Sequence, residues 1–257
     1  MKYYYNIFGV DASFTGFGIT SIQPYTRSIL LNEFSVKLDG GTFANVVKAS
    51  DEMTDILHDY LYETSNEYHE YDYDFSNYCG MEIPPTQGFY SVKLWALDAQ
   101  VYKKLNEFCD NQTRLFGAPY LRFINGKSSD KKETMKVVSE FLKIFKKHQF
   151  KIEQLNDEIN RMSYKQSKKL GYYEDVGFTN NEADSFIYAL RMFIIYAVNN
   201  VDEIKRLGLD ELVRDLISFK PRLAVTKESL IGKLDKDHID TFEEFIPFEI
   251  EPSIIQQ

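Results

Sequence analysis

The sequence is poor in the residues that build cross-linked or membrane-anchored proteins. Its two cysteines in 257 residues, Cys79 and Cys109, provide neither a disulfide framework nor a zinc-binding spacing, so we expect both to be reduced and packed. No apolar run approaches the roughly 20 residues that span a bilayer. Residues 1–5 lead directly into a strand pattern rather than a secretory signal. These absences exclude the secreted disulfide-rich and membrane-spanning classes and predict a cytoplasmic protein.

Basic residues are outnumbered by acidic ones, 30 to 39, which gives a net charge of −9 at pH 7. This balance excludes proteins that coat nucleic acid, because they carry an excess of positive charge. The cations are nevertheless concentrated. Residues 120–170 hold 13 lysines and arginines against 6 acidic residues, a net charge of +7, so the remainder of the chain carries −16. This block predicts a local contact with a polyanion, although a solvated helix face would have the same composition.

The hydrophobic pattern predicts an α/β protein. A three-strand meander followed by alternating strands and helices indicates a five-stranded mixed sheet, antiparallel at one edge and parallel beyond, flanked by helices. We expect one domain over residues 1–199 with an insertion at about 148–178, and a helical or irregular C-terminal extension over 200–257. The expected strands cover residues 4–10, 16–22, 27–38, 75–83 and 119–124, and the expected helices cover 43–62, 91–109, 129–145, 179–199 and 201–219.

Three segments far apart in the chain each place one carboxylate at the end of a predicted element. Asp11 and Glu82 end strands, and Asp184 lies in the first turns of a helix. Hydrolysis of a phosphodiester requires stabilisation of the negative charge on the attacking and leaving oxygens. Two Mg²⁺ ions about 4 Å apart can provide this stabilisation. Mg²⁺ prefers carboxylate oxygens. The three acids therefore predict a two-metal nuclease site in which Mn²⁺ substitutes for Mg²⁺, although Asp11 alone could instead cap a turn.

The start of the last apolar helix contains two overlapping signals. Thr179 and Glu182 have the spacing of a capping box, which assigns Glu182 a structural role. Asn181 and Asp184 are three residues apart and share a helix face. We therefore expect Asn181 as the fourth position of the catalytic site, where an amide oxygen ligates Mg²⁺ more weakly than a carboxylate.

Polar and aromatic residues near the first two acids are candidate DNA contacts. Ser13 and Thr15 could donate to a phosphate or cap the turn that contains them. The glycines of residues 16–18 could let backbone approach a phosphate or allow the hairpin to twist. Phe89 and Tyr90 follow the second acidic strand in an expected loop, where a ring could stack on an unpaired base or pack at the start of the next helix.

These segments, taken in order, resemble RuvC-type Holliday junction resolvases. Residues 9–18 resemble the GxDPSxTxxG opening of that family, with Ala12 in place of the proline, and residues 81–82 resemble its second acidic strand. Residues 125–131 resemble its glycine-lysine segment, and residues 182–190 its closing AADALA-type helix. The helix at 91–100 also matches in order. The resemblance covers roughly residues 5–196.

The resemblance implies an RNase H-like fold, a homodimer and Mg²⁺-dependent paired nicking of four-way DNA junctions in recombination, repair or phage DNA processing. It assigns catalysis to Asp11, Glu82 and Asp184. It implies no nucleotide cofactor. The family usually has Asp or His where this chain has Asn181. The phosphate contacts that we expect from the glycine-lysine segment and the helix after it are Lys127, Lys131 and Lys132.

Other functions fit parts of the same pattern. An RNase H-like nuclease could act on flaps, forks or RNA–DNA hybrids instead. The amide at Asn181 also fits a DNA-binding or assembly protein with a degenerate site that no longer cleaves. An actin-like ATP-binding domain opens with a similar strand-turn-strand, but we find no second glycine-rich phosphate turn. Enrichment in Lys, Asn, Ile, Tyr and Phe is typical of an AT-rich genome such as a phage, which would place the protein in bacterial or phage-infected host cytosol.

Overall fold

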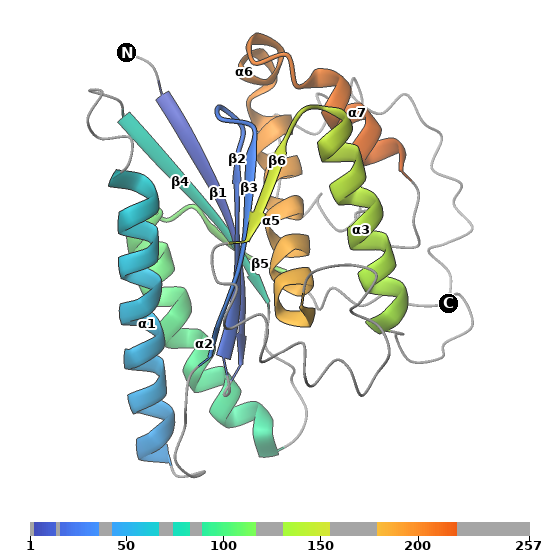
Figure 1. The fold of residues 1–257 in the computed structure, drawn as a ribbon. Coiled ribbons are helices and arrows are strands. Elements are labelled where there is room, and N and C mark those ends of the chain that lie inside the picture. Colours follow the sequence, from blue (N-terminus) through green and yellow to red (C-terminus); the bar gives the residue numbers. More distant parts are fainter. Residues whose placement is uncertain are drawn as a thin grey trace, which may run out of the picture.

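The computed structural model of the chain describes residues 3–13, 16–35, 43–66, 74–82, 89–116, 131–154 and 179–219. Strands and helices alternate along most of it (Figure 1). The elements are β1 Tyr3–Ser13, β2 Gly16–Gln23, β3 Ser28–Ser35, α1 Phe43–Asn66, β4 Asp74–Glu82, α2 Phe89–Phe108, β5 Thr113–Phe116, α3 Lys131–Lys147, β6 Lys151–Gln154, α5 Asn180–Asn199, α6 Val201–Arg206 and α7 Asp210–Ser218.

The strands form one mixed sheet in the order β5-β4-β1-β2-β3-β6. β1, β2 and β3 are an antiparallel meander, β4 and β5 extend it in parallel beyond β1, and β6 pairs in parallel with β3. The α/β class and the mixed sheet with an antiparallel meander are confirmed. The meander extended by parallel strands, with helices on both faces, is the RNase H-like arrangement that the sequence resemblance implied.

The expected count of five strands is one short. β6 lies within the predicted insertion at 148–178 and pairs with residues 28–31 of β3. It has a single apolar residue, Ile152, so it forms because β3 offers an edge and not because its own pattern is strand-like. The fifth strand predicted at 119–124 lies outside the described residues, and the strand beside β4 is Thr113–Phe116.

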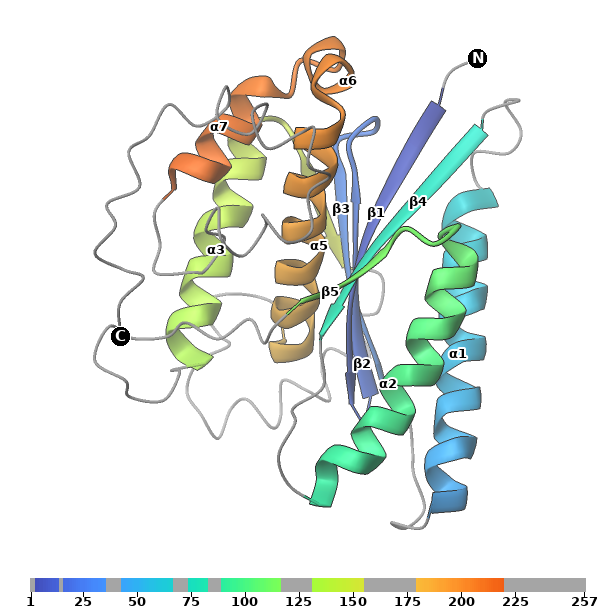
Figure 2. The same cartoon turned by 180° about the vertical axis from the view of Figure 1, so that it is seen from behind.

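Helices cover both faces of the sheet, and each interface has its own apolar core (Figures 1 and 2). Side chains alternate along a strand, so Phe8 and Val10 of β1 pack toward α1 and α2, whereas Ile7 packs toward α5. α5 is buried along nearly its whole length, because it contacts the sheet on one side and α3 on the other. This central helix carries the last of the three predicted acids.

Glycines in the central strands allow the backbone of α5 to lie directly on the sheet. A Cβ atom at Gly9 would lie 2.0 Å from the carbonyl oxygen of Ser185, and one at Gly18 would lie 2.1 Å from that of Asn181. No real Cβ tolerates such contacts. Gly18 therefore accommodates the start of α5, a role that differs from the phosphate approach or hairpin twist considered from the sequence.

The helix expected over 201–219 is two helices, α6 and α7. The break occurs at Gly208, whose φ of 63° ends the first helix and which an L side chain would adopt only with strain. Ile204 of α6 and Leu212 of α7 are buried in the same apolar core as α5. Residues 201–218 therefore complete the packing around the central helix.

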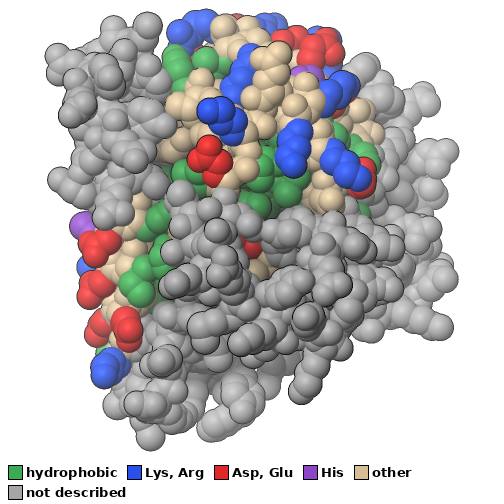
Figure 3. Space-filling view, in the orientation of Figure 1, with side chains coloured by type: hydrophobic (Ala, Val, Ile, Leu, Met, Phe, Trp, Pro, Cys, Tyr) green, Lys and Arg blue, Asp and Glu red, His purple; other side chains and the backbone are tan. Residues whose placement is uncertain are grey.

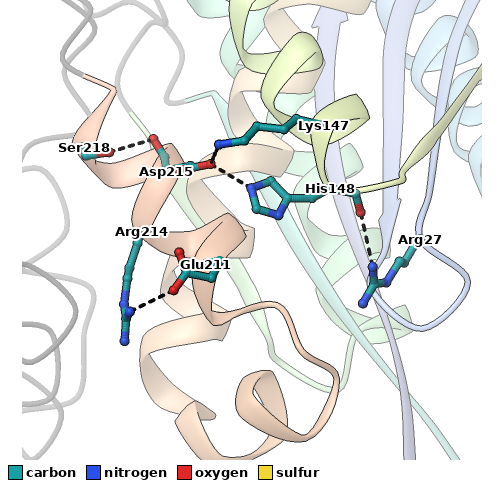
Figure 4. Close-up of polar contacts among 7 residues, drawn as sticks. All are labelled: Arg27, Lys147, His148, Glu211, Arg214, Asp215 and Ser218. Atoms are coloured by element: carbon teal, nitrogen blue, oxygen red, sulfur yellow. Dashed lines mark hydrogen bonds and ion pairs between the residues drawn. The ribbon is translucent and has the colours of Figure 1, made fainter.

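A polar cluster ties the far end of the sheet to α7 (Figure 4). Arg27, in the turn between β2 and β3, donates to the carbonyl oxygens of His148 at 3.3 Å and Leu207 at 3.1 Å. Asp215 accepts from Lys147 Nζ at 2.7 Å and lies 2.8 Å from His148 Nε2, and these hydrogen bonds lower the pKa of the Asp215 carboxyl. The His148 side chain is only 17% exposed.

The two cysteines are both free and buried, as predicted. Burial raises the pKa of each thiol above its ordinary value, so both are neutral packing residues. No helix in the described part of the chain is long and apolar enough to cross a membrane.

Candidate active site

Asp11 and Glu82 lie at the same level of the sheet on neighbouring parallel strands. They are one residue beyond the last bonded pair of β1 and β4. Across β1, Asp11 pairs with Gly18, and Gly18 pairs with Glu33 of β3. Directly paired residues project from the same face of a sheet. This row of positions therefore faces α5 and carries three carboxylates and one glycine.

Asp184 is brought to this row by the way α5 lies on the sheet. The carbonyl of Asn181 lies over Gly18, and that of Ser185 lies over Gly9. Ser185 Oγ is also 2.9 Å from Thr20 Oγ1 on β2. Asp184 sits between these two contacts and is only 5% exposed, and Asp11 is 9% exposed. Both acids are therefore held in a largely dehydrated place, where charge is costly.

The side chain of Tyr188 is a common neighbour of the three predicted acids. It follows Asp184 by one helical turn and is fully buried. Burial raises the pKa of its hydroxyl, and the charges of Glu82, Asp11 and Asp184, in that order, raise it further. Its Oη has no hydrogen-bond partner among the described residues. Carboxylates from β1, β4 and α5 are therefore all near enough to this buried hydroxyl for their charges to act on it.

The capping box predicted at the start of α5 is confirmed. The backbone nitrogen of Thr179 donates to Glu182 Oε2 at 2.6 Å, and that of Glu182 donates to Thr179 Oγ1 at 3.2 Å. Glu182 is fully buried by this exchange. It fixes the first turn of the helix, and with it the direction in which Asp184 enters the site.

Asn181 makes a contact that sequence reasoning missed. Its Nδ2 donates to Glu33 Oε1 at 2.8 Å, and Glu33 is only 6% exposed. Because the amide nitrogen is turned to Glu33, the amide oxygen is the atom left to meet a cation or a water. The signal for Glu33 was present, since it continues the alternation of the buried residues Ile29 and Leu31 on β3.

Asp98 of α2 is a second missed carboxyl. It is 6% exposed, and burial, followed by the charge of Glu82, raises its pKa to about 7. In the sequence it lies four residues after Leu94 and three before Val101, so it belongs to the apolar face of its helix. An acidic residue on the apolar face of a helix indicates a buried carboxyl, and this signal was overlooked because the helix was identified from its apolar residues alone.

The predicted DNA contacts lie at or beyond the limits of the described structure. For five of them the structure describes the backbone, at the end of a helix or strand, but not the side chain: Ser13, Phe89, Tyr90, Lys131 and Lys132. The other two, Thr15 and Lys127, lie outside the described residues. Phe89 and Tyr90 form the first turn of α2, so their expected place in a loop before that helix is wrong.

The part of the basic block from Lys143 to Lys151 lies away from the acids. Lys151 pairs with Ser28, which is five residues, or about 17 Å, from Glu33 along β3. Two of the exposed lysines of α3 are engaged with acids: Lys143 with Glu140, and Lys147 with the carboxylate of α7. Basic side chains gather in the upper part of Figure 3, with acidic ones among them. This part of the block has the character of a solvated helix face.

A hard divalent cation fits the chemistry of the donor set. Asp11, Glu82 and Asp184 offer carboxylate oxygens, the ligands that Mg²⁺ and Mn²⁺ prefer, from elements that packing holds rigid. Among the described His, Cys, Asp and Glu side chains, no group of three is arranged to hold an ion. The three acids therefore lie at the same level of the sheet, but their carboxylates are not close enough together to bind one ion. Binding of a cation would have to bring these carboxylates closer to one another.

Comparison with known proteins gives a distant structural match. No family model and no curated protein matches the chain. Among solved structures it is similar to the human cytomegalovirus terminase nuclease domain. The Mn-soaked, inhibitor-bound form is 11% identical with a TM-score of 0.38, over 78% of this chain and 85% of that one. A second structure of that domain is also 11% identical with a TM-score of 0.38, over 72% and 81%. The RuvC resemblance remains a hypothesis from sequence.

Proposed function

We propose that this protein is a divalent-metal-dependent nuclease that hydrolyses DNA phosphodiester bonds. The observation that carries the proposal is that Asp11, Glu82 and Asp184, from three separate elements, lie at one level of the sheet beside the buried Tyr188. Asp11 and Asp184 are buried, and Glu82 beside them is partly buried, so three mutually repelling carboxylates here are costly without a cation. A structural role alone gives no reason to bring them together.

In this proposal Asp11, Glu82 and Asp184 would hold two Mg²⁺ ions, and the bound ions would supply the Lewis-acid chemistry that activates a water and stabilises the leaving oxygen. The protein's own part is placement. Asp11 and Glu82 stand on central strands, and Asp184 is fixed by the seating of α5 on the glycines. Asn181, turned by Glu33, presents its amide oxygen to a water or a ligand. Such preorganisation on rigid elements is what a phosphodiesterase needs.

For the substrate we propose branched DNA, with the four-way junction as the first choice because of the ordered sequence resemblance. A homodimer would supply the two active sites that paired nicks require. α3 and α5 start at the same end of the molecule in Figure 1, so the first residues of α3 lie toward the site. The proposed DNA contacts are Ser13, Thr15, Phe89, Tyr90, Lys127, Lys131 and Lys132.

The test is the Asp11→Asn variant, which keeps the size of the side chain and removes its charge. We expect wild-type protein with Mg²⁺ to nick a four-way junction, and Asp11→Asn to lose nicking while it still binds the junction. Asp55→Asn, an exposed acid on α1, is the matched control and should cleave normally. Unchanged cleavage by Asp11→Asn would overturn the mechanism. Equal cleavage of junctions, flaps, forks, hybrids and linear duplex would end the branched-DNA claim.

A non-cleaving DNA-binding protein is the second candidate. The amide of Asn181, bonded to Glu33, and the lack of a closed group of three ligands among the described residues favour it. It predicts junction binding without cleavage and no shift of the melting temperature when Mg²⁺ or Mn²⁺ is added. The nuclease proposal predicts a rise in melting temperature, because an ion bound only by the folded protein stabilises it.

A further inference from the structure

We propose that Arg191 is a built-in counter-cation of the acidic site, a positioning residue that offsets the charge of the carboxylates when no divalent ion is bound. The inference rests on the proposed function, since it assigns a role toward the same site. It concerns a residue that sequence reasoning treated as part of an apolar helix. It makes the contribution of Arg191 to stability depend on whether an ion is present.

Arg191 lies on the face of α5 that carries the acid and the tyrosine. It follows Tyr188 by three residues and Asp184 by seven, which places all three on one side of the helix. Its guanidinium carbon is 5.8 Å from the ring centroid of Phe116. Phe116 pairs directly with Glu82 across β4 and β5. The guanidinium thus stands over the strand position next to Glu82.

The helix that carries Arg191 lies directly on the sheet near the guanidinium. A Cβ atom at Gly80 would lie 2.6 Å from the carbonyl oxygen of Tyr188 and 2.8 Å from Cε2 of Phe116. Helix, ring and strand are therefore in direct contact at this level. Arg191 is 5% exposed, so its charge is enclosed with the acids and is not spread into solvent.

Burying a guanidinium in this way is costly, because water no longer solvates its charge. Burial lowers the pKa of Arg191, while the charges of Tyr188 and Glu82 act in the opposite direction. The acidic site has the complementary problem, since its carboxylates repel one another. One enclosed cation relieves both costs. Once divalent ions are bound, however, the same cation competes with them for the carboxylates.

The competing explanation is that Arg191 only fills space, with its stem packed in the core and its guanidinium over the ring of Phe116. The two explanations differ in one measurable respect. A packing role is lost equally whether or not an ion is bound. A counter-charge role is lost mainly when no ion is bound, because a bound ion replaces the missing positive charge.

The experiment is thermal unfolding of the full chain, with a chelator or with excess Mn²⁺, for wild type, Arg191→Gln, Arg191→Met and Arg191→Lys. We expect Mn²⁺ to raise the melting temperature of both neutral variants by roughly 4 °C or more beyond its effect on wild type. Arg191→Lys keeps the charge and should respond as wild type does. Arg206→Gln, which removes an exposed arginine of α6, is the matched control and should also respond as wild type.

Titration calorimetry with Mn²⁺ gives a second readout that does not depend on activity. Removal of a competing cation should tighten Mn²⁺ binding by Arg191→Gln, by about tenfold relative to wild type. An equal Mn²⁺ response in wild type and neutral variants would overturn the inference, and so would neutral variants that stay unfolded even with Mn²⁺. If wild type itself does not respond to Mn²⁺, the proposed function fails, which is a different result.

Discussion

Replacement of Gly9 by alanine tests how α5 is held on the sheet. The new Cβ would lie 2.0 Å from Ser185 O and 2.2 Å from Ala189 N, whereas ordinary contact begins at 3.4 Å. The helix backbone must therefore move outward by about 1.4 Å. Overpacking of a core costs about 1–3 kcal/mol, and this site belongs at the upper end because both clashing atoms are backbone.

The displacement has a consequence for the site as well as for stability. Ser185 follows Asp184 directly, so a shift at Ser185 carries the Asp184 carboxylate away from Asp11. A misplacement of about 1 Å can cost about 10²-fold in rate. Gly9→Ala should therefore lower both the urea midpoint and Mg²⁺-dependent cleavage, and the loss of cleavage should persist under conditions where the variant is fully folded.

Gly208→Ala provides the control for this prediction. Among the described residues its new Cβ would meet only Arg27 Nη2, at 3.7 Å, so its cost comes from backbone strain at positive φ. It should lower stability without changing the rate of cleavage by the folded protein. Wild-type stability and cleavage in Gly9→Ala would refute the close seating of α5 and the position that it gives Asp184.

Three further predictions follow from single contacts. Thr179→Ala removes one half of the capping box and should lower the free energy of unfolding by about 1 kcal/mol in urea denaturation; an unchanged midpoint would contradict the cap. The hydrogen bond from Lys147 lowers the pKa of Asp215, so this pair stabilises the fold above the unfolded pKa of that acid, and the contribution is lost as pH falls through its folded pKa. Asp215→Asn should therefore flatten the acid side of the melting profile, and an unaltered profile would count against the pair. Asp98 has its pKa raised to about 7 by burial and then by Glu82, so its ionisation destabilises the fold as pH rises from about 4 to 7. Asp98→Asn should be more stable than wild type at pH 8 by thermal melting, and lower stability there would show that the charged form is needed.

The parts of the site that could be predicted from sequence are those with local signals. Asp11 and Glu82 stand where an apolar strand pattern meets polar residues, so their positions follow from a few neighbours. The capping box of Thr179 and Glu182 is a four-residue signal, and it located the start of α5 to within one residue. The resulting α/β topology followed because connections of these lengths leave few alternatives.

The parts that could not be predicted depend on partners distant in the sequence. β6 is a strand because β3 lies beside it, and its own four residues carry little strand pattern. Arg191 sits in an apolar run, and its surroundings are set by Phe116, which is 75 residues earlier in the chain. Gly18 resembled a turn or phosphate-binding glycine until α5 was found packed against it. In each case the decisive neighbour comes from another element.

The central claim is that Asp11, Glu82 and Asp184 form one two-metal centre. A crystal structure of the full chain soaked in Mn²⁺, with anomalous scattering to locate the ions, tests it most directly. The account predicts two ions about 4 Å apart, both bound by oxygens of these three side chains. Crystals in which Mn²⁺ is bound elsewhere, or in which the three carboxylates stay apart with no ion between them, would contradict it.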